Sequence, residues 1–133
     1  ANIDGVHAMT DVTGFGLLGH LLEVCRGSAL AARVRMADVP LLDDVAALAS
    51  AGFVTGASAR NWASYGDEVR LAPVVCGTDR ALLCDPQTSG GLLIACARDA
   101  LGAVLEILHR HGFSRPACIG EMVVGTPRVT VEG

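Results

Sequence analysis

The sequence predicts a fold of the α+β or three-layer α/β class, in which helices pack on a mixed β-sheet. The 133 residues are 51% hydrophobic but only 4% aromatic, and 16 of them are glycine, so the core must consist of small aliphatic side chains on a closely packed backbone. Apolar residues recur with helical periodicity in some segments and form short runs in others. A chain of this length holds one core, so we expect a single domain over residues 1–133.

The N-terminal part is expected to hold a helix, a strand and a second helix. Apolar residues recur every three or four positions in Phe15–Cys25, which predicts a helix with a broad buried face that Gly27 ends. The alternation in Arg33–Met36 predicts a short strand. Pro40 fits the first turn of the second helix, because its missing N–H costs nothing there, and Gly52 is expected to end that helix.

The C-terminal part is expected to contain most of the sheet. The apolar run Leu92–Ala97 predicts a central strand buried on both faces. The clearest helical periodicity lies in Arg98–His111, with Gly112 as the end of that helix. We expect the remaining segments to be a loop with a short helix (Thr55–Gly66), an extended edge (Val69–Val75) and two closing strands (Ala117–Val124 and Arg128–Val131).

Charge and composition exclude several classes of function. The net charge is −4, and the charges are scattered, whereas a nucleic-acid interface needs a clustered basic patch. No apolar run approaches the roughly 18 residues that cross a bilayer. All ten basic residues are arginines, so chemistry that needs a lysine must come from elsewhere. We expect a cytoplasmic protein that binds neither nucleic acid nor membrane.

The five cysteines indicate thiols in a reducing compartment. They are odd in number and widely spaced, and no two form a CxxC pair. We therefore expect reduced and mostly buried thiols, not a zinc site. The histidines are expected to be structural or solvated. In particular, we expect His20, which lies off the apolar face of the first helix, to be partly exposed.

Two glycine-containing motifs are the most specific features of the chain. They are TDVTGFG at Thr10–Gly16 and DPQTSGG at Asp85–Gly91. Each places a carboxylate shortly before a threonine and two glycines, which suits a nucleotide phosphate bound through Mg²⁺. The spacing alone favours an ordinary structural explanation, because glycine-rich turns are frequent in proteins that bind no phosphate: Asp11 or Thr13 caps the following helix, and Asp85 forms an Asx turn.

These motifs, in their surroundings, resemble a known family. The stretches HAMTDVTGFGLLGHLLE (His7–Glu23) and LLCDPQTSGGLLIA (Leu82–Ala95) are similar to signature stretches in the C-terminal half of the selenophosphate synthetase (selenide, water dikinase) family. RNWASYG, at Arg60–Gly66, resembles a third such stretch. That family belongs to the superfamily of enzymes related to aminoimidazole-ribonucleotide (AIR) synthetase. The resemblance implies the AIR-synthase C-terminal-domain fold.

The resemblance also implies an activity and a division of roles. The family makes selenophosphate, AMP and phosphate from ATP, selenide and water, with Mg²⁺ bridging the nucleotide phosphates. Asp11 matches the aspartate of the C-terminal half that binds Mg²⁺. Thr10, Thr13 and Gly14 match the same motif and are expected to shape its loop beside the nucleotide, and Asn61 is a weaker candidate for contact with the same cleft.

The resemblance further implies that this chain is one part of a larger two-domain enzyme. The catalytic cysteine or selenocysteine, the catalytic lysine and the other metal aspartates of the family belong to an N-terminal domain, so we expect no catalytic residue here and no turnover by this chain alone. The implied partners are that domain, ATP, selenide and a second copy in a homodimer. Two alternatives stay open: a related ATP-dependent enzyme of purine or thiamine type, and a non-catalytic module that binds a nucleotide or a partner.

Overall fold

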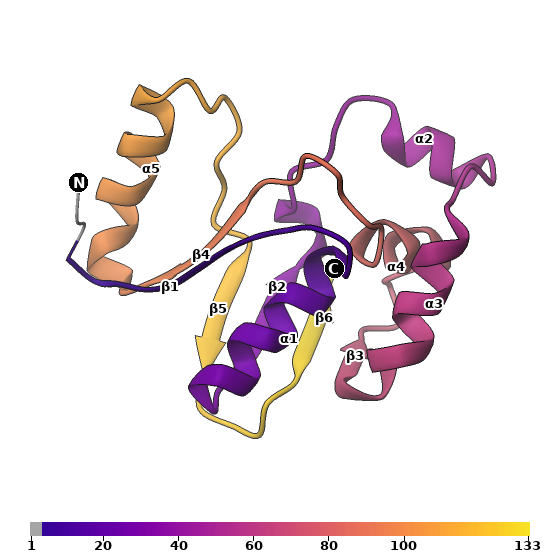
Figure 1. The fold of residues 1–133 in the computed structure, drawn as a ribbon, viewed down its shortest axis with the longest axis horizontal. Helices are drawn as coiled ribbons and strands as arrows, with labels where there is room; N and C mark the ends of the chain where they lie inside the picture. The colour runs from indigo at the N-terminus through magenta and orange to yellow at the C-terminus, as the bar shows by residue number, and fades with distance from the viewer. Residues whose placement is uncertain (1–3) are drawn as a thin grey trace.

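A computed structural model describes residues 4–133 of the chain (Figure 1). The helices and strands follow one another as β1 (Val6–Asp11), α1 (Gly16–Ser28), β2 (Ala31–Arg35), α2 (Val45–Ser50), α3 (Gly56–Tyr65), β3 (Val69–Leu71), α4 (Gly77–Leu83), β4 (Leu92–Cys96), α5 (Leu101–Arg110), β5 (Gly120–Val123) and β6 (Val129–Glu132). Single 3-10 turns lie at Met36–Asp38, Gly66–Glu68 and Arg98–Ala100. The expected fold class, helices packed on a mixed sheet, is confirmed.

Four strands form a mixed sheet in the order β3-β6-β2-β5. β6 runs parallel to both β3 and β2, whereas β5 is antiparallel to β2. The helix α1 covers one face of this sheet (Figure 1). Its Leu18 and Leu22 are fully buried and join Val34, Val129 and Val131 in the core. Burial of each such leucine contributes about 1.5–3 kcal/mol, so the contact between α1 and the sheet stabilises the fold.

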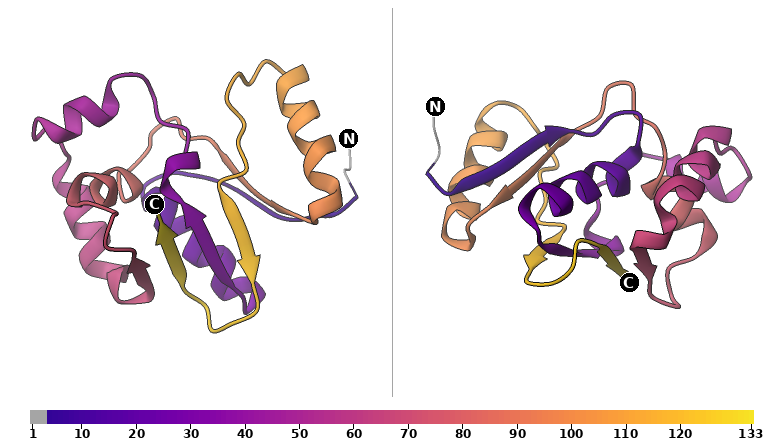
Figure 2. Two further views of the ribbon diagram at one scale, coloured as in Figure 1. Left: turned by 180° about the vertical axis from the view of Figure 1, so that it is seen from behind. Right: turned by 60° about the horizontal axis from the view of Figure 1, so that its bottom comes forward.

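The other two strands form a separate antiparallel ribbon. β1 pairs with β4, so that Met9 lies opposite Ile94 and Asp11 lies opposite Leu92. The ribbon crosses above α1, and residues 12–15 lead from its end into that helix (Figures 1 and 2). Leu92 is 51% exposed and Met9 is 62% exposed. The prediction of a central strand buried on both faces was therefore wrong, and so was the expectation that all the strands share one sheet.

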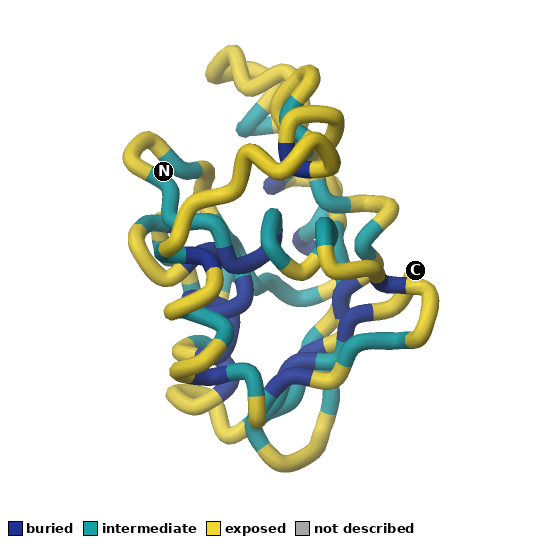
Figure 3. Tube along the Cα trace, turned by 90° about the vertical axis from the view of Figure 1, so that its right-hand side faces the viewer, coloured by how far each residue is buried: buried dark blue, intermediate teal, exposed yellow. Residues whose placement is uncertain are grey.

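The helices α3 and α4 pack beside the beginning of α1. Tyr65 of α3 and Leu83 of α4 are buried in the same core as α1. The buried segments gather on α1 and the sheet, and α2 lies at the exposed periphery (Figure 3). The guanidinium carbon of Arg80 in α4 lies 5.2 Å from the ring centre of Trp62 in α3, and this contact joins the two helices at the surface.

Several expected boundaries were wrong. α1 continues through Gly27 and ends one residue later, where Ala29 takes the left-handed conformation at φ 54°. The second helix begins at Val45, five residues after Pro40, and Gly52 does follow its end with φ 92°. The segment expected to be a loop with a short helix is mostly the ten-residue α3, because Thr55 caps it by accepting a hydrogen bond from the Ser58 N–H.

The strand β1 was not predicted at all, whereas the C-terminal elements agree with the sequence pattern. α5 has the expected apolar stripe, and Gly112, at φ 88°, follows its last turn. β5 is shorter than the predicted segment Ala117–Val124 and lies inside it, and β6 is displaced by one residue from the predicted Arg128–Val131. Within residues 4–133 no helix has both the length and the apolar character that crossing a membrane requires.

Candidate functional site

The two glycine-containing motifs lie against each other at the beginning of α1. The N–H of Val12 donates to the Gly91 carbonyl at 2.9 Å, and the N–H of Gln87 donates to the Thr13 carbonyl at 3.0 Å. Gly16 has φ 69°, and a Cβ on it would stand 2.6 Å from the carbonyl carbon of Cys84. Glycine is therefore required at position 16 both for the backbone conformation and for close approach.

Asp11 occupies the end of β1, directly before the first motif turns into α1. Its side chain is exposed, and within residues 4–133 its carboxylate takes part in no hydrogen bond or ion pair. The Thr10 hydroxyl donates to the Asp11 main-chain carbonyl at 3.3 Å, which fixes the backbone beside it. No group of three or more metal-ligating His, Cys, Asp or Glu side chains occurs in that part of the chain. Asp11 thus offers one open carboxylate, not a complete metal site.

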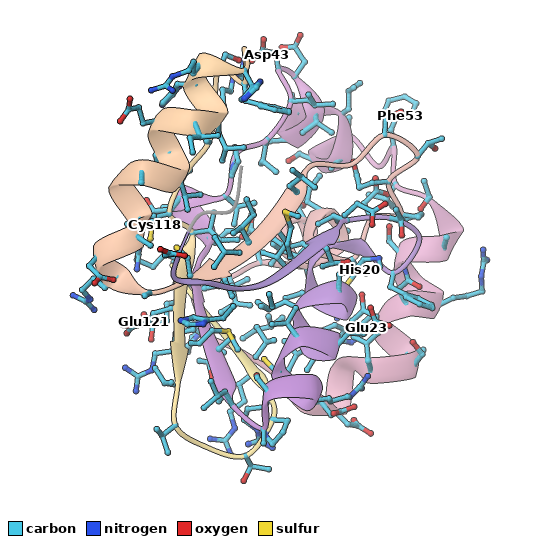
Figure 4. All side chains as sticks on the ribbon, turned by 60° about the vertical axis from the view of Figure 1, so that its left-hand side comes forward. His20, Glu23, Asp43, Phe53, Cys118 and Glu121 are labelled. Carbon is cyan, nitrogen blue, oxygen red and sulfur yellow. The ribbon has the colours of Figure 1, made fainter. Side chains whose placement is uncertain are left out.

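A buried histidine holds the loop that follows Asp11. Nε2 of His20 lies 3.0 Å from the Thr13 hydroxyl, and Nδ1 lies 3.1 Å from a carboxylate oxygen of Glu23. His20 and Glu23 both project from α1, three residues apart (Figure 4). His20 is only 7% exposed, and its ring packs 5.7 Å from that of Phe15. The expectation that His20 is partly exposed was wrong, because this face of α1 lies under the motif loop.

Asn61 and Tyr65 of α3 bind the same loop from its other side. The Asn61 amide donates to two main-chain carbonyls, those of Gly14 and Cys84, at 2.9 Å each. The Tyr65 hydroxyl donates to the Phe15 carbonyl at 2.6 Å. Burial raises the pKa of Tyr65 above its ordinary value, and contact with the Cys84 thiol raises it further. The segment Arg60–Gly66, the third stretch that resembles the family, therefore holds the loop of the first motif through the side chains of Asn61 and Tyr65.

Asp85 organises the second motif from within. One carboxylate oxygen accepts hydrogen bonds from the hydroxyls of Thr55 and Ser58, at 3.2 and 3.1 Å. The other oxygen accepts one from the Gln87 amide at 3.0 Å. Asp85 joins the beginning of α3 to the motif DPQTSGG. Its carboxylate thus has a structural task, in contrast to the open carboxylate of Asp11.

A groove of about 350 Å³ lies between α3 and α4. Its lining includes Trp62, Arg80, Thr78 and the hydroxyl-bearing Thr55 and Ser58. Asp11 does not line it, so the groove and the open carboxylate are separate features of the surface.

The cysteines are less buried than expected. All five are free, but only Cys25 and Cys84 are buried; Cys96 is intermediate, and Cys76 and Cys118 are exposed. Burial raises the pKa of the Cys25 and Cys84 thiols. The sequence does not tell the buried cysteines from the exposed ones, because cysteine occurs both in apolar segments and in turns.

The sequence of the chain was compared with models of known protein families. A sequence model of the family described as "AIR synthase related protein, C-terminal domain" matches residues 1–132. The chain belongs to this family. The mixed sheet covered by α1 and the adjoining ribbon is thus an example of the AIR synthase related C-terminal domain.

Curated relatives of this AIR synthase related domain carry the name selenide, water dikinase. The chain is 55% identical to the one from Pseudomonas straminea and 57% identical to the one from Burkholderia pseudomallei (strain K96243), in both cases over 98% of the chain and 37% of the relative. It is 53% identical to the one from Dechloromonas aromatica (strain RCB), over 98% of the chain and 38% of the relative. The chain thus spans little more than a third of these relatives.

A solved structure supports the same fold. The thiamine-monophosphate kinase from Stenotrophomonas maltophilia K279a superimposes with a TM-score of 0.56 over 97% of this AIR synthase related domain and 32% of that kinase. The sequence identity is 22%, so this likeness shows the fold alone.

The structure brings the predicted residues of the AIR synthase related domain into one region. Asp11, Thr10, Thr13 and Gly14 are consecutive or nearly so, and Asn61 reaches them from α3. Neither Asp11 nor Thr13 caps α1, because the residue before that helix is Phe15 and no side chain caps it. Sequence reasoning missed the contributions of His20, Glu23 and Tyr65. The spacing of His20 and Glu23, three residues apart on one helix, is the signal that points to the first two.

Proposed function

We propose that this chain is the C-terminal domain of a selenide, water dikinase, which makes selenophosphate, AMP and phosphate from ATP, selenide and water. The observation that carries the proposal is the identity of 53–57% to proteins of that name over 98% of the chain. The region of the two paired motifs, with one open carboxylate at its edge, is the part of the surface to which we assign the function.

In this proposal Asp11 is a ligand of Mg²⁺. An exposed carboxylate oxygen without a competing partner in the described chain suits this hard cation, which is usually bound in proteins by one or two carboxylates together with waters and substrate phosphates. Mg²⁺ supplies neutralisation of the negative charge on the transferring phosphoryl groups. Because this domain offers one such ligand and not a cluster, the other ligands come from the nucleotide and from the rest of the enzyme.

The neighbouring residues hold Asp11 in place. Thr10 fixes the Asp11 backbone, while the carbonyls of Thr13 and Gly14 accept hydrogen bonds from the second motif and from Asn61. In the assembled enzyme we place Thr10, Thr13, Gly14 and Asn61 beside the nucleotide as a wall of the ATP cleft. Phosphoryl transfer depends mainly on positioning and charge stabilisation, so a rigid wall is what such a domain contributes.

The rest of the machinery lies outside this chain in our proposal. We assign the nucleophilic cysteine or selenocysteine, the catalytic lysine and the remaining metal carboxylates to an N-terminal domain. The complete absence of lysine from these 133 residues agrees with that assignment. We further propose that the full enzyme is a cytoplasmic homodimer and that this chain alone is inactive.

Two alternatives are less well supported. A related ATP-dependent enzyme of purine or thiamine type would share the fold, but the thiamine-monophosphate kinase is only 22% identical, far below the selenide, water dikinases. A non-catalytic module that binds only a nucleotide or a partner would leave the open carboxylate of Asp11 without a task.

A chimera tests the proposal. The 133 residues replace the corresponding segment of the Pseudomonas straminea relative, and phosphorus NMR follows the conversion of ATP in the presence of Mg²⁺ and selenide. We expect selenophosphate from the chimera and none from the 133 residues alone. Turnover by the isolated chain contradicts the proposed division of roles. A chimera that folds but is inactive, while the relative is active, contradicts the proposed function.

A further inference from the structure

The strongest unexplained feature is the chain of contacts from Glu23 through His20 to Thr13. The two heavy-atom distances, 3.1 and 3.0 Å, are those of hydrogen bonds, and the imidazole between them is 7% exposed. A buried imidazole held at both nitrogens has a fixed orientation, and neither nitrogen of His20 is left without a partner. This arrangement lies beside the loop of the first motif, and the proposed function uses neither His20 nor Glu23.

With an ionised Glu23 and a neutral His20 ring, the chemistry of the three groups sets the direction of the hydrogen bonds. An ionised Glu23 carboxylate only accepts, so Nδ1 of His20 carries the hydrogen of that bond. In the neutral ring Nε2 is then an acceptor, and the Thr13 hydroxyl donates to it. The Thr13 oxygen keeps its lone pairs, and its hydrogen is committed to the ring.

Thr13 is also held by its backbone. Its carbonyl accepts from the N–H groups of Gly16 and Gln87, at 3.1 and 3.0 Å. Thr13 is therefore fixed by three contacts, from His20 in α1, from Gly16 at the beginning of α1 and from Gln87 in the second motif. It lies two positions after Asp11. The orientation of the β1 end therefore depends on the point at which Thr13 is anchored.

We propose that His20, oriented by Glu23, is a positioning residue that anchors Thr13 and thereby holds Asp11 in the geometry that binds the divalent cation. This inference rests on the proposed function. Partners that orient a metal ligand from behind commonly change metal affinity by about 10–100-fold when they are removed. His20 itself touches neither substrate nor cation and acts only through Thr13.

The test measures cation binding and not only turnover. In the chimera described above, Mn²⁺ alone is titrated and the free ion is followed by electron paramagnetic resonance. We expect Thr13→Val and His20→Ala each to weaken Mn²⁺ binding about tenfold or more. Thr13→Ser and Glu23→Gln keep the hydroxyl and the acceptor, so we expect a change of less than about threefold for each. His20→Gln retains an acceptor near the position of Nε2 and should fall between these groups.

A matched control separates positioning from general loss of structure. His109→Ala removes an exposed histidine in the last turn of α5 and should leave Mn²⁺ binding unchanged. Circular dichroism checks that each variant is folded. If His20→Ala does not fold, Thr13→Val decides, because it removes the hydroxyl with little change in volume. We also expect Thr13→Val to need a higher Mg²⁺ concentration for half-maximal activity.

The possible outcomes distinguish this inference from the proposal on which it rests. If Asp11→Asn weakens Mn²⁺ binding while folded Thr13→Val binds it as tightly as the unsubstituted chimera, the positioning role is refuted and the metal role of Asp11 stands. Equal losses for Thr13→Val and Thr13→Ser also refute it, because the serine retains the hydroxyl. If Asp11→Asn itself binds Mn²⁺ normally, the proposed function fails first, and the positioning role fails with it.

Discussion

Gly90 lies against Val12 so closely that a Cβ on the glycine would stand 1.7 Å from the Val12 carbonyl oxygen. The same Cβ would lie 3.0 Å from the Cβ of Gln87. No side chain fits this space, so the glycine of the second motif serves the contact between the two motifs. The glycines of this motif suggest a loop that binds phosphate. At position 90, however, glycine is required for a steric reason, because the Val12 carbonyl leaves no room for a side chain.

Replacement of Gly90 should separate the two motifs. We expect Gly90→Ala to lower the free energy of unfolding by about 1–3 kcal/mol or more, because the contacting atom belongs to the backbone of Val12. Gly91→Ala is the matched control, since a Cβ there meets nothing within 4 Å, and its effect should stay within about 0.5 kcal/mol. Urea denaturation followed by circular dichroism measures both. Equal stabilities of the two variants would show that the motifs do not pack as described.

Removal of the Asn61 amide should loosen the same region from the side of α3. Asn61→Ala leaves the carbonyls of Gly14 and Cys84 without their donor, and we expect a loss of about 1–3 kcal/mol in stability. The control Ser64→Ala removes one exposed hydrogen bond, to the Asn61 carbonyl, and should cost less than about 0.5 kcal/mol. Thermal unfolding measures the stability of the two variants. If Ser64→Ala loses as much stability as Asn61→Ala, the two hydrogen bonds of the Asn61 amide do not hold the loop as described.

The chain has one tyrosine, so its ionisation can be followed by ultraviolet absorbance without interference from another. Burial raises the pKa of Tyr65 above its ordinary value of 10.0, so the native state holds this proton more tightly than the unfolded state does. The resulting stability is fully present below pH 10.0 and is lost as the pH rises above it. The buried thiols of Cys25 and Cys84, whose pKa values are also raised, act in the same direction above 9.0.

We therefore expect the tyrosinate signal to appear only together with unfolding as the pH is raised. Tyr65→Phe loses the bond to the Phe15 carbonyl but should show a shallower decrease of stability at alkaline pH. A reversible titration with a midpoint near 10.0, in a protein that keeps its native circular dichroism, would mean that the Tyr65 hydroxyl is not buried as described.

The sequence predicted those elements that have a strong apolar stripe. In α1, Leu18 and Leu22 recur at helical spacing and are fully buried, and the same reasoning located α5 and its Gly112 end. It also singled out two motifs, and the structure shows them in contact. These features depend on local patterns, which a single sequence contains.

Other features depend on tertiary contacts that no local pattern records. β1 was missed because its inward positions are occupied by Val6, Ala8 and Thr10, a weak apolar signal. The apolar run of β4 is equally compatible with a central strand and with a two-stranded ribbon, and only its pairing with β1 decides. The burial of His20 follows from the fold of the motif loop over α1, which helical periodicity does not reveal.

The role of Asp11 as a metal ligand is tested by titrating the Asp11→Asn variant of the chimera with Mn²⁺. Asp67→Asn, which alters an exposed aspartate in the Gly66–Glu68 turn, is the control. We expect Asp11→Asn to fold normally, to weaken Mn²⁺ binding about tenfold or more and to require correspondingly more Mg²⁺ for activity, with Asp67→Asn unchanged. If Asp11→Asn retains both the Mn²⁺ affinity and the Mg²⁺ dependence of the unsubstituted chimera, Asp11 is not a metal ligand, which contradicts the proposed function.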